Sequence, residues 1–269
     1  MGVSKPRLPD VGFLYAERTS QDFQPGSGEA ARLIKSIAFR YEARRLIKEI
    51  GVELEYVIDF ACGSGLFTRC FAESLPGVRV VGTDFHARPP ADLGCVEYRS
   101  LAGINEMTGV ADLVLAMHVV EHDDDPQALL GSIVRLIRPG GYLVVETPNI
   151  DCAWISVFGR MWDAWYLPYH RIHLNRIGLR TLVEASGLTV IRESDVSVPV
   201  IGRTISNILG RRNNLSFILL GAALHPLQWA VERLTRRPSA VRIIARKAWT
   251  VDQDTDLGGQ SARTRLKQR

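Results

Sequence analysis

The chain has 269 residues, 46% hydrophobic and 23% charged, which is the balance of an ordinary globular protein with room for one large α/β domain. Its four cysteines, at positions 62, 70, 95 and 152, form no Cys-x-x-Cys pair. This argues against a disulfide framework or a zinc site and fits buried thiols in a reducing compartment. Residues 1–10 lack the apolar core of a signal peptide, and a cytoplasmic location is predicted.

The net charge of +4 is unevenly distributed along the chain. Residues 200–269 contain 13 Lys and Arg against 4 Asp and Glu, whereas the remainder contains 20 against 25. A basic end of this kind predicts an anionic surface or substrate near it. A solvated face followed by a charged tail explains the same excess.

The first predicted elements are an irregular arm over residues 1–28 and a helix over Glu29–Ile50. The arm mixes Pro, Gly, Ser and Asp, while the helix repeats apolar residues along one stripe. The next run, Tyr56–Phe60, is apolar and stops at glycines, which predicts a buried strand. Gly63 and Gly65 allow a tight turn with close approach of a ligand to the backbone, although many ordinary turns also need glycine.

A strand, a glycine-rich turn and a helix over residues 66–74 are followed by further strands and helices in alternation. Strands are predicted over residues 78–84, 96–99, 112–117 and 142–146, with a helix over 126–137 that begins at a proline and ends at Pro139-Gly140-Gly141. Asn175 caps a helix to Ser186, and strands over 188–198 and 241–246 complete the pattern. Such alternation predicts a doubly wound, mostly parallel seven-stranded α/β sheet.

Ligands of such sheets bind at the carboxyl ends of the strands. Gly63, Asp84, Ser100, His118 and Thr147 all fall at those ends. Asp84 lies about 20 residues past the glycine turn, where a carboxylate accepts hydrogen bonds from ribose hydroxyls in nucleotide-type folds. The separate motifs therefore point to one edge of the sheet.

The order acid, small residue, Gly, Gly in Asp59-x-Ala61-x-Gly63-x-Gly65 resembles motif I of the class I S-adenosylmethionine-dependent methyltransferases. The resemblance continues through residues 111–122, Asp125-Pro126 and residues 136–149, and it covers about residues 54–192. These segments look like the fourth strand, helix and fifth strand of the branch that includes the ubiquinone-biosynthesis O-methyltransferases. Ala61 departs from the first glycine of the family, which lowers the expected cofactor affinity.

The resemblance implies a Rossmann-like fold that binds S-adenosyl-L-methionine. The methyltransferase domain is predicted over residues 29–249, with a helical insert at about 202–237. The polar residues 250–269 have no periodicity, which predicts a disordered tail. Arg40 and Arg44, one turn apart on the first helix, either pair with the carboxylate of the cofactor's methionine part or form a solvated basic face. The cofactor-binding candidates are Asp59, Ala61, Gly63, Gly65, Asp84, Ser100, Leu101, Met117 and Arg40.

The catalytic candidates are four histidines and a glutamate: His118, Glu121, His122, His170 and His173. Methyl transfer from a sulfonium is an in-line displacement that mainly needs alignment, but a hydroxyl acceptor must also lose a proton, and a near-neutral histidine suits a general base. Similar enzymes carry a Glu-x-x-Glu-His run that holds Mg²⁺. Glu121 and His122 match this run, but His118 replaces its first Glu, so a divalent metal is only the weaker alternative. A purely structural role for Glu121 and His122 stays open.

The connection over residues 147–175 carries many aromatic residues, which predicts a wall of the acceptor pocket or a loop packed on the core. His170 and His173 lie on it, and the intervening Arg171 and Ile172 argue against a buried core role for both. The mostly apolar segment 215–231, flanked by arginines, predicts a helical lid, a membrane-surface segment or an oligomer contact.

The sequence therefore predicts an enzyme, an S-adenosylmethionine-dependent methyltransferase that acts on oxygen of a small or lipid-linked acceptor. An N- or C-methyltransferase and a non-catalytic cofactor-binding protein are the alternatives. Peripheral membrane contact is predicted through residues 211–237. No nucleic-acid partner is expected, since the chain lacks the Pro-Pro-Tyr/Phe run of amino-methylating enzymes and a separate binding module.

Overall fold

The computed structural model describes residues 2–3, 28–211 and 214–249, and the predicted tail and most of the predicted arm lie outside these residues. The strands of the main sheet are β2 (Tyr56–Phe60), β3 (Arg79–Asp84), β4 (Glu97–Ser100), β5 (Ala111–Met117), β6 (Ile137–Pro148), β8 (Leu188–Val196) and β9 (Ala240–Lys247). The helices are α1 (Glu29–Ile50), α2 (Leu66–Glu73), α3 (Leu101–Asn105), α4 (Pro126–Leu136), α5 (Ile155–Phe158), α6 (Arg176–Ala185), α7 (Ile201–Ile208) and α8 (Leu215–Thr235).

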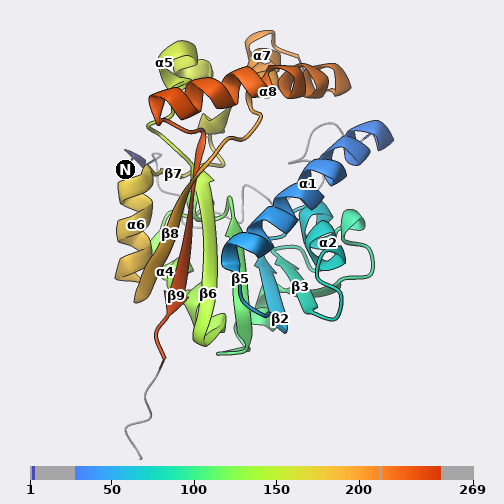
Figure 1. Ribbon diagram of the computed structural model, residues 1–269, viewed down its shortest axis with the longest axis vertical. Coiled ribbons are helices and arrows are strands. Elements are labelled where there is room, and N and C mark those ends of the chain that lie inside the picture. The colour runs from blue at the N-terminus through green and yellow to red at the C-terminus, as the bar shows by residue number, and fades with distance from the viewer. Residues whose placement is uncertain (1, 4–27, 212–213, 250–269) are drawn as a thin grey trace, which may run out of the picture.

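The seven strands have the order β4-β3-β2-β5-β6-β9-β8. The pairs from β4 to β6 are parallel, while β9 lies antiparallel between β6 and β8. The predicted doubly wound, mostly parallel sheet is confirmed, and its parallel strands bring their carboxyl ends to one edge. In Figure 1 that edge faces upward, toward α7 and α8.

Helices cover both faces of the sheet (Figure 1). One apolar layer joins the strands to α4 and α6 through Leu130, Ile133 and Leu179, and the other joins them to α1 and α2 through Leu46 and Phe71. These side chains are all fully buried. The helices begin and end where their caps predict. Asp125 precedes Pro126 and accepts from Ala128 N, Asn175 accepts from Gly178 N, and Gly51 ends α1 in a left-handed conformation.

Two predicted boundaries were wrong. Residues 139–141 belong to β6, which begins at Ile137 and is irregular where it pairs with Ala111–Leu113, so Pro-Gly-Gly is a bulged start of the strand and not a separate turn. The connection over residues 147–175 is also partly helical. It contains α5, the 3₁₀ turns η4 (Gly159–Met161) and η5 (Asp163–Trp165), and the strand β7 (Ile172–His173).

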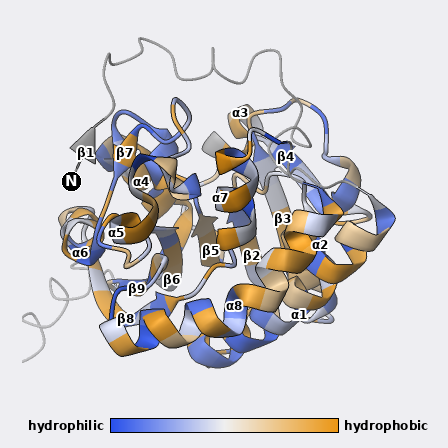
Figure 2. Ribbon diagram, turned by 90° about the horizontal axis from the view of Figure 1, so that it is seen from above, coloured by the Kyte–Doolittle hydropathy of each residue, from blue (hydrophilic) through white to orange (hydrophobic). Residues whose placement is uncertain are grey.

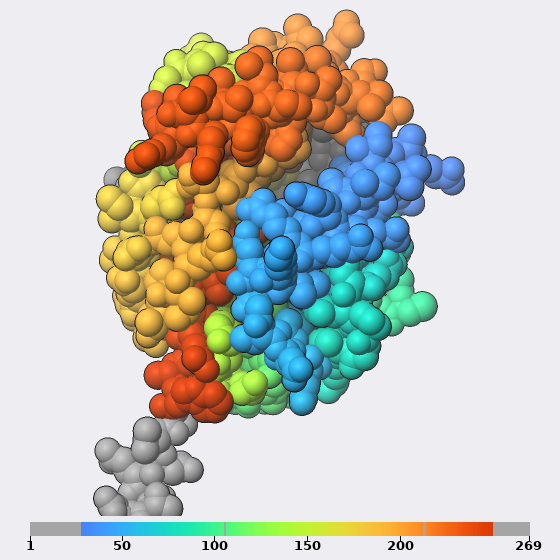
Figure 3. All heavy atoms as spheres, in the orientation of Figure 1, coloured from blue at the N-terminus to red at the C-terminus, as the bar shows by residue number. Residues whose placement is uncertain are grey.

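Two features lie at the carboxyl edge beyond the main sheet. β7 pairs antiparallel with β1 (Gly2–Val3), which places the beginning of the chain beside His173. The predicted insert forms α7 and α8, which cross at two glycines. A Cβ on Gly202 would lie 3.0 Å from Gly221 Cα, so the two helix backbones touch. Figure 3 shows α8 at the surface, lying across the upper part of the molecule.

Candidate active site

The turn after β2 is held by backbone groups and by Asp84. Gly63 N donates to Asp84 Oδ2 at 2.8 Å, and Cys62 N donates to Thr83 O at 2.8 Å. Phe85 N donates to the other carboxylate oxygen of Asp84. The acid that the sequence predicts for ribose recognition therefore also fixes the glycine turn, although burial raises its pKa.

Three residues of the turn have positive φ: Ala61 at 60°, Gly63 at 58° and Gly65 at 79°. Gly65 needs its missing side chain for a second reason. A Cβ there would lie 2.6 Å from Leu93 Cβ, which belongs to the 3₁₀ turn η2 (Ala91–Leu93). Ala61 adopts the same left-handed conformation with a Cβ in place, which is strained.

Asp59 lies on β2 beneath this turn and is almost completely buried. It accepts a hydrogen bond from Thr68 Oγ1 at 2.6 Å. Burial, together with the nearby charge of Asp84, raises the pKa of Asp59 to about 7, despite the opposing hydrogen bond from Thr68. Its carboxyl group is therefore poised to change charge near neutrality.

His118 ends β5 in a left-handed conformation, with φ 56°. Its Nε2 lies 3.0 Å from Glu146 Oε1 and its Nδ1 lies 3.4 Å from Glu121 Oε1. Burial alone would lower its pKa, but the hydrogen bonds and charges of Glu121 and Glu146 outweigh burial and raise the pKa of His118 to about 10. An imidazolium at neutral pH has no lone pair to accept a proton, so His118 is a weak candidate for the general base.

A series of ion pairs between charged side chains of alternating sign connects α1 to His118. Arg242 is buried on β9, where it pairs with Glu42 of α1 and lies 2.6 Å from Glu146 Oε2. Although burial favours the neutral acid, Arg242 and His118 hold the pKa of Glu146 below its ordinary value. Neither Glu146 nor Arg242 was a predicted site residue.

Glu121 and two histidines form the one cluster among the described residues whose ligand atoms suit a metal ion. Ligand atoms of Glu121, His122 and His170 lie within 4.8 Å of one another. His122 Nδ1 lies 3.2 Å from Tyr169 O, and His170 Nδ1 lies 2.8 Å from Ala164 O. Because a carbonyl only accepts, each Nδ1 carries the proton and each Nε2 carries the lone pair of the neutral ring.

The protonation states of Glu121, His122 and His170 are those that metal ligands require. Burial would raise the pKa of Glu121, but its histidine neighbours lower it to about 2. Burial lowers the pKa of His170 to about 3 and also lowers those of His122 and His173. A carboxylate with two neutral imidazoles is a ligand set that binds divalent transition metals, so the residues fit a metal ion.

A narrow pocket opens beside the cluster, between β6 and the aromatic connection. Two buried polar atoms of its lining have no hydrogen-bond partner among the described residues, namely Thr147 Oγ1 and Trp162 Nε1. The Glu121 carboxylate also faces this lining, and its contacts there are with imidazoles, 3.4 Å from His118 Nδ1 and 4.0 Å from His170 Nε2. Buried polar groups normally form hydrogen bonds, so this lining suits a polar ligand. His170 and His173 also line the pocket.

Arg171 and Ile172 were expected to make a buried core role for both histidines unlikely. Both of these residues are themselves buried, and Arg171 pairs with Asp124 at 3.2 Å. His170 is itself buried, whereas His173 is half-buried. Trp162, which packs on Phe158, was missed because one tryptophan among five gives no signal of its depth.

The remaining candidates differ in their distance from the turn. Ser100 pairs in register with Asp84 and caps α3, which Leu101 begins, so both lie near Asp84. Met117 precedes His118 at the end of β5. Arg40 instead donates to Glu73 of α2 at 2.8 Å, on the outer side of the two helices, and is not brought to the turn.

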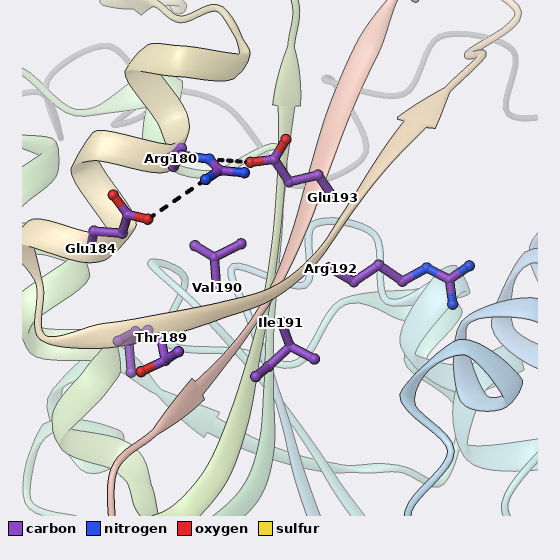
Figure 4. A pocket seen from close by; sticks show the side chains of 8 residues that line it. Arg180, Glu184, Thr189, Val190, Ile191, Arg192 and Glu193 are labelled. Carbon is purple, nitrogen blue, oxygen red and sulfur yellow. Dashed lines mark hydrogen bonds and ion pairs between the residues drawn. The ribbon is translucent and has the colours of Figure 1, made fainter.

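A second hollow lies between α6 and β8 and is lined by Arg180 and Glu193, among others (Figure 4). Three of its charged residues pair with one another, with Arg180 Nε 2.5 Å from Glu193 Oε1 and Arg180 Nη1 4.0 Å from Glu184 Oε1. It contains none of the predicted site residues.

Comparison with known proteins defines the class. Solved structures with this fold include the 1,6-didemethyltoxoflavin-N1-methyltransferase of Burkholderia thailandensis, at TM-score 0.54 and 17% identity, covering 92% of this chain and 94% of that one. They also include the [4+2]-cyclase SpnF, at TM-score 0.52 and 17% identity over 84% of each chain. The fold is that of the Rossmann-like methyltransferases.

The family follows from the sequence. The family model of a methyltransferase domain matches residues 26–193, so the chain belongs to this family, and the predicted class of S-adenosylmethionine-dependent methyltransferases is confirmed. Curated relatives include the ubiquinone biosynthesis O-methyltransferases of Chromobacterium violaceum, 31% identical over 106 residues, and of a Bradyrhizobium species, 38% identical over 103 residues. Each match covers 35% of this chain and 44% or 40% of the relative, so the chain spans less than half the length of these relatives.

Proposed function

We propose that the chain transfers the methyl group of S-adenosylmethionine to an oxygen atom of a small or lipid-linked acceptor. The observation that carries this proposal is the position of two sites along one sheet edge: the turn with Asp84, and the pocket with Glu121 and the histidines. A donor held at the first site faces an acceptor held at the second. In-line transfer then requires mainly alignment and exclusion of water.

Oxygen is the proposed target because neutral imidazoles line or adjoin the pocket. In the reaction the acceptor oxygen forms the new bond to the methyl carbon, the sulfonium leaves as a neutral thioether, and the hydroxyl proton passes to a base. His173 is the best placed base, since it is half-buried and faces the pocket. His170 is weaker, because burial lowers its pKa to about 3.

A metal-assisted version is the second candidate, and the Glu121–His122–His170 cluster favours it. A divalent ion bound there would lower the pKa of an acceptor hydroxyl. In this version Glu121 is the anionic ligand and the two Nε2 atoms are the neutral ones. Chelation separates the versions, because it leaves a metal-free base unaffected.

The acceptor class, the cellular location and membrane contact are also proposals. The similarity to ubiquinone O-methyltransferases and the apolar insert support a lipid-linked acceptor, with cytoplasmic location and peripheral membrane contact through residues 211–237. All four cysteines lie in the described residues as free thiols, which agrees with a reducing compartment.

Cofactor binding is the first test of the proposal. Asp84→Ala should weaken binding of S-adenosylhomocysteine by about 1–3 kcal/mol in calorimetry, because ribose hydroxyls lose their acceptor. Asp112→Ala is the matched control. Asp112 is also a buried acid that accepts two backbone N–H groups, but it lies at the amino end of β5. This variant should lose stability and keep the cofactor affinity.

The acceptor is found by incubating the protein with acceptor pools and radiolabelled S-adenosylmethionine. Label on a nitrogen or carbon atom would replace the O-methylation proposal by the alternative transferases. Tight cofactor binding without labelled product from any pool would favour a non-catalytic protein. Equal cofactor affinity in the Asp84 variant and in wild type would remove the assigned role of Asp84.

A further inference from the structure

Helix α8 packs against the protein through a side that contains two polar residues. Its buried residues are Gly221, Gln228 and Glu232, of which Gln228 is fully buried and Glu232 is 3% exposed. Surface helices of globular proteins normally bury an apolar stripe and expose polar residues. Here the fully buried positions hold a glycine and two polar residues, while the apolar Phe217, Leu224 and Val231 are only half-buried.

Hydrogen bonds hold α8 in this orientation. Glu232 Oε1 accepts from Trp154 Nε1 at 2.9 Å and from Gln228 Nε2 at 2.7 Å, and Gln228 Nε2 also lies 2.6 Å from Val198 O. Rotating the helix to turn its apolar side inward would break these bonds. The orientation is therefore built into the fold, because buried polar groups are costly to leave unpaired.

The outward side of α8 is apolar. Leu219, Leu227, Trp229 and Leu234 are 50%, 60%, 55% and 85% exposed, and Figure 2 shows apolar colours along much of the helix. By length and composition α8 is the one helix among the described residues that could cross a membrane, yet little of it is buried in the protein. An exposed apolar surface of this extent marks an interaction site.

The charges beside this surface are positive. Arg211 precedes α8, Arg233 lies in its last turn and Arg236 follows it, and all three are exposed. The only acidic residue of the helix is the buried Glu232. Apolar side chains flanked by cations match the acyl region and the anionic headgroups of a lipid surface.

We propose that α8 docks the protein on an anionic membrane surface, lying in the plane of the headgroups with its leucines and Trp229 among the acyl chains. A spanning orientation is excluded, because Gln228 and Glu232 stay bonded to the protein. This inference deepens the proposed function. Trp154, which binds Glu232, begins the segment whose Ile155 lines the pocket, so docking holds the pocket near the lipid from which a lipid-linked acceptor would come.

The test is flotation of the full chain with vesicles of phosphatidylcholine alone or with added phosphatidylglycerol, which needs neither cofactor nor acceptor. We expect binding to the anionic vesicles that weakens as salt rises, since headgroup attraction is screened. Replacing Leu219, Leu227 and Leu234 together by Gln should weaken binding about 100-fold, because each leucine loses its apolar transfer. Arg211→Gln with Arg233→Gln should remove the preference for anionic vesicles.

Two variants serve as matched controls. Ile177→Gln on α6 changes an equally exposed apolar residue away from α8, and Arg135→Gln on α4 removes an exposed cation; both should bind vesicles like wild type. Thermal unfolding and cofactor calorimetry must be unchanged in every variant compared.

Absence of vesicle binding at low salt, or equal binding by the leucine variant, overturns the proposal. So does a wild-type dimer that the leucine substitutions convert to monomer without any vesicle binding, because α8 would then contact a second copy. A protein that floats with vesicles but binds no S-adenosylhomocysteine would retain this inference and lose the proposed function.

Discussion

The two halves of the carboxyl edge are built in different ways. On the cofactor side, the turn after β2 satisfies its groups locally: Gly63 N and Phe85 N both donate to Asp84. On the acceptor side, Thr147 Oγ1 and Trp162 Nε1 are buried without hydrogen bonds among the described residues, and the Glu121 carboxylate contacts imidazoles. The first half is complete by its own hydrogen bonds except at Thr83 Oγ1, whereas the second half gathers such groups around one pocket.

This difference predicts where substitutions act. Changes on the acceptor side should alter turnover with little effect on cofactor affinity, and changes beneath the cofactor turn should alter stability and affinity. Buried charges that join the halves should affect stability most.

The largest effect is expected on turnover. Glu121→Gln keeps the shape of the side chain but removes its charge. That charge raises the pKa of the His173 base in one version and would bind the ion in the other. The substitution should lower kcat by about 10²–10⁴ in a labelled-methyl assay with unchanged affinity for S-adenosylhomocysteine. His225→Ala, which alters an imidazole on α8 outside the pocket, should leave kcat near the wild-type value.

Two further measurements decide which version holds. In the base version His173→Ala lowers kcat similarly and EDTA has no effect. In the metal version His170→Ala lowers kcat, EDTA abolishes activity and a divalent ion restores it. Full activity of the Glu121 variant would remove the pocket from the proposed site.

The next effect concerns the charges that join the two halves. Arg242→Met leaves the buried carboxylate of Glu146 without its arginine and removes one of the two ion pairs of Glu42. We expect a loss of about 3–5 kcal/mol in the free energy of unfolding, measured in urea. Arg180→Met breaks an exposed pair between α6 and β8 (Figure 4) and should leave the free energy of unfolding close to that of wild type. Equal losses in the two variants would contradict the joining role of Arg242.

The cofactor side of the sheet edge could be predicted from the sequence better than the acceptor side. Asp59, Gly63, Gly65 and Asp84 belong to a strand–turn–helix–strand unit, so their spacing alone predicts one edge. The acceptor side depends on contacts between distant segments. Arg242 pairs with Glu42, which lies 200 positions away in the sequence, and no local pattern predicts that contact.

Burial was the other property that the sequence predicted poorly. Arg171 was used as an argument against a buried core role for both neighbouring histidines, yet its ion pair with Asp124 allows Arg171 itself to be buried. The apolar run in α8 predicted a lid, a membrane segment or an oligomer contact, but no pattern in it indicated that Gln228 and Glu232 are its buried side chains. That side depends on Trp154 and Val198, which lie elsewhere in the chain.

A smaller effect should appear as pH dependence. The pKa of Asp59 is 3.8 when unperturbed and about 7 in the fold, so the folded state keeps a proton that the unfolded state loses. Stability contributed by this group is therefore present below pH 4 and falls as pH rises toward 7. Asp59→Asn should remove this pH dependence. At pH 8 the free energy of unfolding of this variant should be about 1–4 kcal/mol higher than that of wild type. A stability difference that is constant from pH 4 to 8 would show that Asp59 titrates normally.

The smallest effect tests the departure from the family at Ala61. Its φ of 60° is a conformation that costs an alanine about 1 kcal/mol more than a glycine. Ala61→Gly relieves this strain but also frees the unfolded chain and removes a methyl group that packs on the core, so stability should change by no more than about 1 kcal/mol. Gly63→Ala is the reverse change in the same turn, at φ 58°, and should cost about 1–2 kcal/mol.

Cofactor affinity then distinguishes two explanations of Ala61. If the turn keeps the same backbone conformation when the cofactor binds, strain at Ala61 is equal in the free and bound protein. Strain alone then leaves the affinity of Ala61→Gly within about threefold of wild type, which is the result we expect from calorimetry with S-adenosylhomocysteine. A gain of about tenfold or more would show that the Cβ of Ala61 itself meets the cofactor. The sequence-based expectation of reduced affinity would then hold, and the cofactor side would not be complete before its ligand arrives.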